Sequence, residues 1–289
     1  MKDKYLKKLE TESIYIIREV YCSFRNPVLL YSVGKDSGIT AKLAIKAFYP
    51  EPVPFPLMHV DTSYKFPEMY EFREKFCKEN NLRLIIYRNE KWIEKKCHPI
   101  REGTDICCSH LKTEALLDAL KKYDFDAAIG GARREEEKSR AKERIFSVRD
   151  RYGQWEPKAQ KPELWDLYNT FLKPDESMRI FPLSNWTELD IWRYIKEENI
   201  PVVPLYFAKK RKVINENGIL ILSERGKEKM CRFRTLGCAP CTGAIESEAD
   251  TVDKVIEEVK KVNRSERENR LIDLNSDSAM EDKKKRGYF

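Results

Sequence analysis

Apolar residues in the first half of the chain fall either in short continuous runs or at every third or fourth position. The short runs lie at Val28–Tyr31, Leu57–Val60, Leu82–Tyr87 and Ala127–Ile129, and each has the length of a parallel strand. Helical spacing covers residues 5–24, 39–48, 67–80 and 109–123, with Pro67 in a first turn and Ser109 as an N-cap. This alternation predicts an α/β fold, a parallel twisted sheet with helices on both faces.

Beyond residue 150 the pattern changes. Thr187–Asp190 is a variant of the capping box and predicts a helix to about Asn199. Asn217-Gly218 is typical of a hairpin turn, and residues 252–262 have helical spacing. We therefore divide the chain into an α/β core at 1–150 and a C-terminal extension at 151–289, which we expect to complete the site and carry a partner surface. The extension contains many prolines and four tryptophans, Trp155, Trp165, Trp186 and Trp192. We therefore expect it to be irregular in structure and packed through aromatic side chains.

The loop Ser32–Ser37, with the sequence Ser-Val-Gly-Lys-Asp-Ser, joins the first predicted strand to the helix that follows. In such a strand–loop–helix unit, backbone N–H groups and the positive end of the helix converge on an anion. Gly34 lets the backbone approach closely, and Lys35 adds a mobile positive charge. The loop lacks the G-x-x-x-x-G-K-[ST] pattern of a Walker A motif, but a phosphate group is the occupant it predicts.

Two further polar segments follow predicted strands, and ligands of parallel sheets bind beyond the carboxyl ends of strands. Asp61 suits a ribose hydroxyl or a magnesium-bound water, or it caps the following turn, and both interpretations stay open. Gly130 and Gly131 lead into residues 133–144, which hold six basic and four acidic side chains. A solvated helix is the ordinary explanation of such a run, but its place at the rim favours a flexible anion clamp.

Charge and composition narrow the class of protein. The 289 residues are 41% hydrophobic and 36% charged, with a formal net charge of +7. Acids and bases are mixed almost everywhere, so nucleic-acid binding and a basic pocket for a small polyanion explain the charge equally well. A membrane span and a signal peptide are not predicted, because long apolar runs are missing. We expect a cytoplasmic protein whose eight cysteines stay reduced unless they bind metal.

The phosphate loop resembles the S-x-G-K-D-S loop of the PP-loop, or adenine nucleotide alpha-hydrolase-like, family, whose members grip the outer pyrophosphate of ATP. Along the chain the resemblance becomes more specific, and it is to the small, ATP-binding subunit of heterodimeric sulfate adenylyltransferases. It is carried by six blocks in order: Ser32–Ser37, His59–Thr62, Phe125–Arg144, Pro182–Trp192, Arg232–Cys238 and Lys285–Phe289.

This resemblance implies that ATP and sulfate react to give adenylyl sulfate and pyrophosphate, with Mg²⁺ as cofactor. It also implies a GTPase partner subunit, whose GTP hydrolysis helps to drive the unfavourable formation of adenylyl sulfate. Neither a membrane nor a nucleic-acid partner is expected. Because sulfate and the α-phosphate are both anionic, the site needs cations and N–H donors more than an acid or a base. The candidate catalytic residues are Lys35, Arg133, Arg134, Lys138 and Arg140, and the candidate nucleotide-binding residues are Ser32, Gly34, Lys35, Asp36, Ser37, Asp61, Gly130, Gly131, Arg232 and Arg234.

Four cysteines form two close pairs, Cys107-Cys108 and Cys238-x-x-Cys241. The pattern resembles the ligand set of iron–sulfur adenylyl sulfate reductases, which share the PP-loop fold. Four thiolates suit a [4Fe–4S] cluster or zinc, whereas four reduced, buried thiols are the ordinary alternative. We predict a metal site at these residues, a cluster or zinc.

Two other functions stay open. A sulfonucleotide reductase would share the fold, the loop and the cysteine pattern. Such reductases resemble one another in a nucleophilic cysteine near the C-terminus. The last cysteine here is Cys241, which counts strongly against reductase activity. A PP-loop enzyme that modifies tRNA would suit the net charge, and steep salt dependence of RNA binding would support it.

Overall fold

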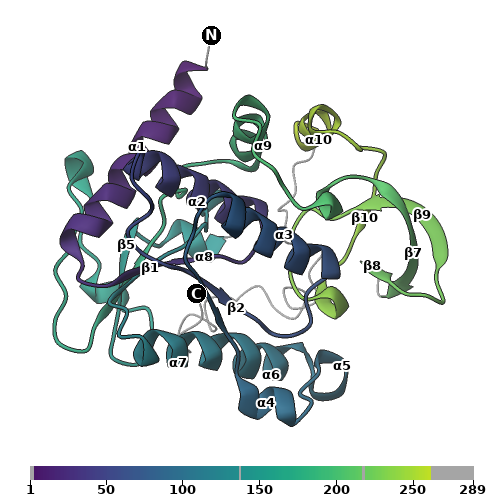
Figure 1. The fold of residues 1–289 in the computed structure, drawn as a ribbon, viewed down its shortest axis with the longest axis horizontal. Helices are drawn as coiled ribbons and strands as arrows, with labels where there is room; N and C mark the ends of the chain where they lie inside the picture. The colour runs from purple at the N-terminus through teal and green to yellow at the C-terminus, as the bar shows by residue number, and fades with distance from the viewer. Residues whose placement is uncertain (1–2, 137, 217–218, 262–289) are drawn as a thin grey trace.

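The computed structural model of the chain describes residues 3–136, 138–216 and 219–261, and Figure 1 draws it as a ribbon. A six-stranded sheet forms its centre, with the strand order β3-β2-β1-β4-β6-β5. Every neighbouring pair is parallel except β5 and β6, which run antiparallel. The strands are β1 (Pro27–Leu30), β2 (Leu57–Val60), β3 (Leu84–Tyr87), β4 (Ala127–Ile129), β5 (Phe146–Arg149) and β6 (Ser177–Ile180).

Helices cover both faces of this sheet, as Figure 1 shows, so the predicted α/β fold is confirmed. Neighbours in β1 point to opposite faces, because Leu29 belongs to the larger apolar core and Val28 to a smaller one. On the larger core lie α1 (Lys4–Ser23), α2 (Lys35–Phe48), α3 (Pro67–Glu79) and α9 (Glu188–Glu197), with α10 (Val252–Val259) packed on α9. The other side carries α4 (Glu90–Glu94), α5 (Pro99–Glu102), α6 (Thr104–Cys108), a π-helical turn (Ser109–Glu114) and α7 (Ala115–Lys122).

The strand order reverses between β1 and β4. From β1 the chain moves outward through β2 and β3, and it then returns to place β4 on the other side of β1. The connections on the two sides of this point leave a crevice at the carboxyl ends of the strands. The loop after β1 and the Gly130-Gly131 pair after β4 therefore lie side by side, as the sequence predicts.

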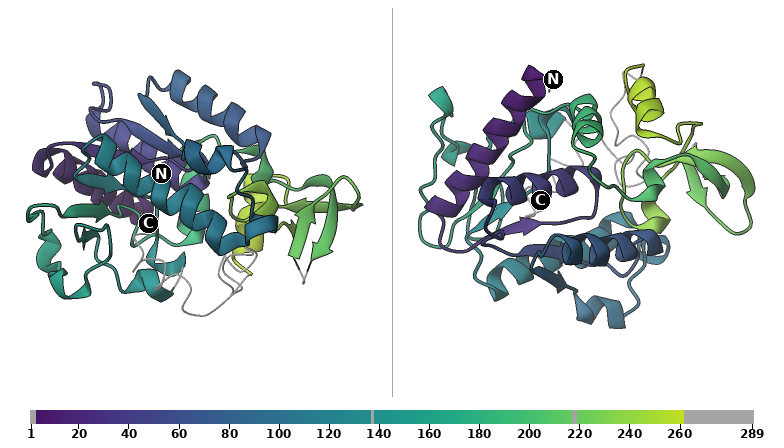
Figure 2. Two further views of the ribbon diagram at one scale, coloured as in Figure 1. Left: turned by 90° about the horizontal axis from the view of Figure 1, so that it is seen from below. Right: turned by 45° about the horizontal axis from the view of Figure 1, so that its top comes forward.

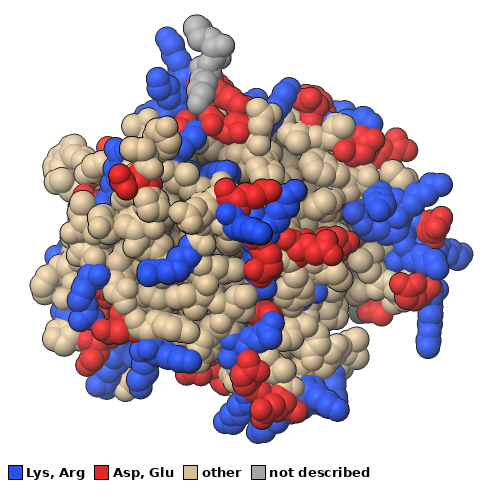
Figure 3. All heavy atoms as spheres, in the orientation of Figure 1, with Lys and Arg blue, Asp and Glu red and all other residues tan. Residues whose placement is uncertain are grey.

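A second, antiparallel sheet with the order β10-β9-β7-β8 stands beside the first, and Figure 2 shows it projecting from the body. Of this sheet, the sequence predicted only a hairpin with its turn at Asn217-Gly218. The turn lies outside the described residues, but the strands on either side of it pair antiparallel, as a hairpin requires. On the face drawn in Figure 3, basic side chains gather over this sheet, and the two signs mix elsewhere. Its strands are β7 (Lys209–Glu216), β8 (Ile219–Leu222), β9 (Lys227–Arg232) and β10 (Ile245–Glu246).

Most predicted elements have their expected bounds, including the capping box in which Thr187 and Asp190 exchange hydrogen bonds at the start of α9. The predicted N-cap at Ser109 is wrong. Ser109 has helical dihedral angles inside a run that begins at Thr104, with Gly103 as its N-cap. The main sheet also takes β6 from beyond residue 150, while the division into 1–150 and 151–289 stays a prediction. Within the described part of the chain, each helix is too short or too polar to cross a membrane.

Candidate active site

The loop Ser32–Ser37 leaves β1 and turns directly into α2, whose N-cap is Gly34. Its backbone is held in place from within: Ser37 Oγ donates to Gly34 O at 3.0 Å and lies 3.2 Å from Ser32 Oγ. The unusual dihedral belongs to Val33, which has φ 67° although a β-branched side chain disfavours that region. A strained residue next to a helix N-terminus is typical of a functional turn.

Lys35 is buried at this turn and is fixed at both ends. Its backbone N–H donates to Tyr206 Oη at 2.8 Å, and its Nζ lies 3.1 Å from Asp36 Oδ2. Tyr206 stands 171 positions later, in a 3₁₀ turn (Pro204–Tyr206). No local pattern could identify this tyrosine, because only the tertiary fold brings it to the loop.

Gly131, after β4, touches the first turn of α2 so closely that a side chain would not fit. A Cβ built on Gly131 would lie 2.9 Å from the carbonyl carbon of Asp36 and 3.0 Å from Ser37 N. Two residues later, Arg133 Nε donates to Asp36 Oδ1 at 2.8 Å. Burial raises the pKa of the Asp36 carboxyl, but Lys35 and Arg133 outweigh it and hold that pKa below its usual range.

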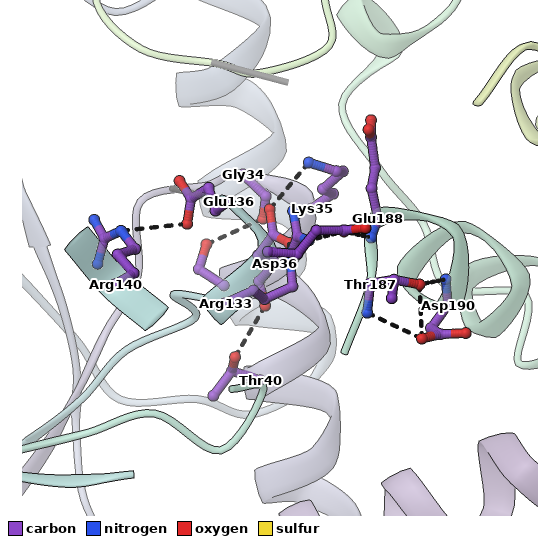
Figure 4. A network of polar contacts seen from close by, with 12 residues as sticks. Gly34, Lys35, Asp36, Thr40, Arg133, Glu136, Arg140, Thr187, Glu188 and Asp190 are labelled. Carbon is purple, nitrogen blue, oxygen red and sulfur yellow. Dashed lines mark hydrogen bonds and ion pairs between the residues drawn. The ribbon is translucent and has the colours of Figure 1, made fainter. Parts of the chain in front are cut away.

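Alternating charges continue from this pair toward α9, as Figure 4 shows. Arg133 Nη1 lies 3.2 Å from Glu135 Oε2, which accepts the backbone N–H of Glu188 at 2.6 Å. Glu188 pairs in turn with Arg234 at 2.5 Å. Burial raises the pKa of Glu188, but the positive charges of Lys35 and Arg234 lower it by more, so the pKa lies below its usual range. The network ties the loop, the segment after β4 and the C-terminal extension together.

A cavity of about 240 Å³ opens beside the loop. One part of its wall is apolar and consists of Leu30 in β1, Met58 and Val60 in β2, and Leu116 in α7. Seven predicted site residues line it, namely Ser32, Gly34, Lys35, Asp36, Ser37, Gly131 and Arg140. The sequence did not predict the cavity residues Lys65, Lys112, Tyr206, Thr235, Leu236 and Gly237.

Arg140, one of the predicted catalytic residues, lines this cavity and has guanidinium N–H groups that are not used in hydrogen bonds within the described structure. Its side chain is 8% exposed, and its Nε lies 3.5 Å from Glu136 Oε2, an ion pair longer than a good hydrogen bond. Its buried Nε and Nη1 find no hydrogen-bond partner among the described residues. Lys138 lies two residues earlier, at the start of α8 (Lys138–Ala141), but its side chain is outside the described part of the chain.

The other predicted residues lie outside the cavity wall. Gly130 extends the main sheet, donating to Ile180 O at 2.8 Å, and Arg134 donates to Asn185 Oδ1 at 2.6 Å. Arg232, in β9, is buried against Glu258 at 2.6 Å. These contacts are all to other groups of the protein, and the predicted roles of these residues in substrate binding stay predictions.

Asp61 also lies outside the cavity wall, although it directly follows β2. Its carboxylate accepts hydrogen bonds from Ser63 N at 2.8 Å, Tyr70 Oη at 2.9 Å and Arg88 Nη2 at 2.7 Å. Burial raises the pKa of Asp61, but these hydrogen bonds outweigh it and leave the pKa lowered. Of the two interpretations of Asp61, its contacts favour the cap of the following turn.

The four cysteines predicted as metal ligands come together from two distant segments. Cys107, Cys108, Cys238 and Cys241 line one small cavity of about 10 Å³. Burial raises the pKa of the Cys241 thiol to about 12. As they stand, no three His, Cys, Asp or Glu side chains among the described residues are arranged to hold a metal ion. The metal therefore stays a prediction.

Comparison with known proteins agrees with this geometry. Residues 26–244 match the phosphoadenosine phosphosulfate reductase domain family. Sulfate adenylyltransferase subunit 2 of Phocaeicola vulgatus is 55% identical over 100% of this chain and 98% of its own, and that of Sulfurimonas denitrificans 54% over 99% and 97%. The fold is also that of Candida glabrata FMN adenylyltransferase in complex with ATP, with a TM-score of 0.53 at 15% identity over 92% of this chain and 88% of that one. The chain therefore belongs to the sulfate adenylyltransferase subunit 2 family of nucleotidyltransferases.

Proposed function

We propose that this chain is the catalytic, ATP-binding subunit of a sulfate adenylyltransferase. It joins ATP and sulfate to form adenylyl sulfate and releases pyrophosphate. Family membership supports the reaction class. The observation that carries the proposal is the loop Ser32–Ser37, a helix N-terminus that faces a cavity with an apolar wall and several cations.

In this proposal the β- and γ-phosphates of ATP occupy the loop, where the N-terminus of α2 and Lys35 stabilise the leaving pyrophosphate. The base lies against the apolar wall formed by Leu30, Met58 and Val60. Mg²⁺ would be held mainly by the triphosphate itself and would offset its negative charge, because such ions are bound chiefly through substrate phosphates.

Sulfate lies at Arg140 in this proposal. A guanidinium that is buried, lines the cavity and has two nitrogens without hydrogen-bond partners in the described structure suits a doubly charged oxyanion. Lys65 and Lys112 add positive charge to the same cavity. Because sulfate is ionised at neutral pH, its oxygen attacks the α-phosphorus without losing a proton. The site therefore works by bringing two anions together and stabilising the charge on the departing pyrophosphate.

Arg133 and Arg234 act as positioning residues in this scheme, since their guanidinium groups are already paired with carboxylates of the protein. Arg133 holds Asp36, which holds Lys35, and Arg234 holds Glu188 at the start of α9. Arg134, Arg232, Asp61 and Gly130 support the surrounding backbone through the contacts described above. Lys138, two residues before Arg140, is proposed to add positive charge on the sulfate side.

The printed name of the relatives implies another subunit, and we propose that it is a GTPase. Its docking surface is an apolar ridge, which we define as Leu164, Trp165, Leu167 and Phe171, all exposed. The ridge is pinned from beneath, because Glu163 accepts the backbone N–H groups of Ile145 and Phe146 at 3.0 and 2.8 Å. Large apolar side chains held outward on a fixed segment fit a protein partner better than water.

We also propose that Cys107, Cys108, Cys238 and Cys241 hold a thiophilic metal, zinc or a [4Fe–4S] cluster. The donor set fits either, since four sulfurs from two segments face one cavity. The four sulfurs are not in ligand geometry as they stand, so binding a metal would require them to move. Adenylyl transfer moves no electrons, so this metal would be structural.

Exchange of labelled pyrophosphate into ATP tests the function. With the partner subunit and Mg²⁺ present, we expect exchange that depends on sulfate and needs no RNA. Exchange that proceeds equally without sulfate would contradict a sulfate adenylyltransferase. Thiol-dependent release of sulfite from adenylyl sulfate without added ATP would instead favour the reductase.

A further inference from the structure

His59 lies in β2, and its imidazole makes a hydrogen bond to the neighbouring strand segment. Its Nδ1 lies 2.8 Å from the backbone carbonyl oxygen of Tyr31, and the residue is 1% exposed. Because a carbonyl oxygen only accepts, Nδ1 must donate, so the proton of the neutral ring lies on Nδ1. Burial and the positive charge of Lys65 lower the pKa of His59 to about 3, which keeps the ring neutral at pH 7.

Tyr31 is the residue at which the chain leaves the main sheet for the phosphate loop. It follows Leu30, where β1 ends, and directly precedes Ser32. Its backbone is held on both sides by β2, since Tyr31 N donates to Met58 O at 2.8 Å while Tyr31 O accepts from His59. Tyr31 also lines the nucleotide cavity. The imidazole therefore fixes the peptide group that joins the sheet to the loop.

Val33, two residues later, carries the strained backbone of this loop. Its φ of 67° is unfavourable for a β-branched residue and persists only where the surrounding structure enforces it. On the other side of Val33, the backbone N–H of Lys35 donates to Tyr206 Oη at 2.8 Å. His59 and Tyr206 therefore hold the backbone before and after the strained residue.

A buried histidine that only completes a hydrogen bond of the core is the ordinary alternative. Ser13 makes a contact of that kind, because its buried hydroxyl donates to Pro182 O at 2.8 Å, and neither residue is among those that line the nucleotide cavity. His59 differs in what it holds, namely a carbonyl that belongs to a cavity residue and precedes a strained turn. Its buried Nε2 has no hydrogen-bond partner among the described residues, so the Nδ1 contact is what orients the ring.

We propose that His59 is a positioning residue for the phosphate loop. Its Nδ1–H holds the Tyr31 carbonyl and, together with Tyr206, keeps the turn at Val33 in the conformation that binds the triphosphate. The proposal rests on the proposed nucleotide function and adds a residue to it. Without this hydrogen bond the strained turn relaxes, and only a fraction of the chains presents the loop in its binding conformation. The affinity for ATP falls by that fraction.

Hydrogen exchange of the full chain tests this anchor without any nucleotide. Asparagine at position 59 places its amide nitrogen one bond from Cγ, as Nδ1 is, and can still donate to Tyr31 O. Glutamine places its amide nitrogen one bond farther, at the position of Nε2. We expect faster exchange across residues 32–38 in His59→Gln and exchange close to the parent in His59→Asn. Equal exchange of this segment in all three proteins would overturn the proposal, as would an equal increase in both variants.

The affinity for a nonhydrolysable ATP analogue, measured by calorimetry, gives the second test. We expect His59→Gln to weaken binding roughly tenfold, the order of effect of leaving one buried carbonyl unpaired, and His59→Asn to stay within about threefold of the parent. Ser13→Ala, which loses a buried hydrogen bond elsewhere, should be less stable in urea but bind the analogue as the parent does. If Ser13→Ala loses as much affinity as His59→Gln, affinity merely follows stability and the positioning role is wrong.

Tyr206→Phe removes the other anchor and keeps the aromatic ring. Because both anchors hold one strained turn, the second substitution should add little once the first has released it. We therefore expect the double variant with His59→Gln to lose clearly less affinity than the product of the two single losses. Single effects that multiply would contradict a shared action on the turn.

The parent protein supplies a measurement that needs no variant to fold. Nitrogen-15 NMR of the three histidines should show one imidazole, that of His59, with its proton on Nδ1 at pH 7. An imidazole of His59 protonated on Nε2 instead could not donate to Tyr31 O, and the proposal would fail.

The outcomes separate this proposal from the nucleotide function. Tight binding of the analogue with unchanged exchange in His59→Gln overturns the anchor and leaves the nucleotide function standing. Failure of the parent to bind the analogue overturns the nucleotide function, while the exchange rates and the tautomer still report on the anchor itself.

Discussion

Arg133 Nε donates to Asp36 Oδ1 at 2.8 Å, although 97 positions separate the two residues. The contact joins the segment after β4 to the first turn of α2, and Asp36 also holds the Nζ of Lys35 at 3.1 Å. One carboxylate therefore fixes both a cation that faces the cavity and an arginine that stands behind it. Because these cations lower its pKa, Asp36 stays ionised at neutral pH and keeps hold of both.

Lys35→Ala should remove the main side-chain charge that stabilises the leaving pyrophosphate. We expect kcat/KM for sulfate-dependent pyrophosphate exchange to fall by about 10²–10³-fold, comparable to the loss of one transition-state donor. Lys254→Ala, at an exposed lysine of α10 that pairs with Asp250, serves as the matched control. An alanine variant with full exchange activity would remove Lys35 from the mechanism.

Gly131→Ala should displace the phosphate loop, since its Cβ would meet backbone atoms of Asp36 and Ser37 at 2.9 and 3.0 Å. We expect kcat/KM for ATP to fall on the order of 10²-fold, as small misplacements of a site can cost that much. Gly38→Ala is the matched comparison, because its Cβ would meet nothing within 4 Å inside α2. There the change should raise the free energy of unfolding by about 0.5–1 kcal/mol. Equal effects of the two substitutions on ATP use would refute the close-approach explanation.

Arg140→Ala should act on sulfate rather than on ATP. We expect kcat/KM for sulfate to fall by roughly 10²-fold, with the dissociation constant of an ATP analogue within about twofold of the parent. Arg140→Lys should recover only part of the loss, because an ammonium cannot make the bidentate contact. Arg25→Ala, whose side chain is 72% exposed, provides the control. A pure loss of ATP affinity would move Arg140 to the phosphate side.

Asp61→Asn should change the dependence of stability on pH. The folded-state pKa of Asp61 lies below its ordinary value, so its ionised form stabilises the fold above the unfolded-state pKa of about 3.9. That contribution disappears as pH falls through the lower, folded-state pKa. Urea unfolding should show Asp61→Asn less stable than the parent by about 2 kcal/mol at pH 7, with the gap closing in acid. A gap independent of pH would show that the carboxylate charge is not what matters.

Trp165→Ser should weaken the complex with the partner subunit and leave the fold intact, since Trp165 is 85% exposed. A central aromatic residue of an interface contributes about 2 kcal/mol, so we expect the dissociation constant to rise roughly 30-fold. Ile100→Ser, exposed on another part of the surface, is the matched control. Measurement by calorimetry or analytical ultracentrifugation distinguishes the two, and equal affinities would place the partner elsewhere.

Local patterns were sufficient for much of the fold. The buried face of α1 consists of residues with helical spacing, such as Leu6, Leu9 and Ile16, and the capping box at Thr187 begins α9 as expected. These features depend on neighbours within a few positions, and turn chemistry and periodicity report on such neighbours directly. Ser109 failed as a cap because the preceding residues already continue the helix, which a capping preference alone does not reveal.

The amino-acid sequence by itself determined the phosphate loop, the order of strands and helices around it, and the pairs of cysteines, because each is written in consecutive residues. Only the tertiary structure decided that Tyr206 accepts the N–H of Lys35, that Arg140 faces the cavity while Arg232 is buried against Glu258, and that four cysteines share one space. Such contacts join residues that are far apart along the chain, and which cation reaches a cavity depends on packing and on the carboxylates that already occupy its neighbours.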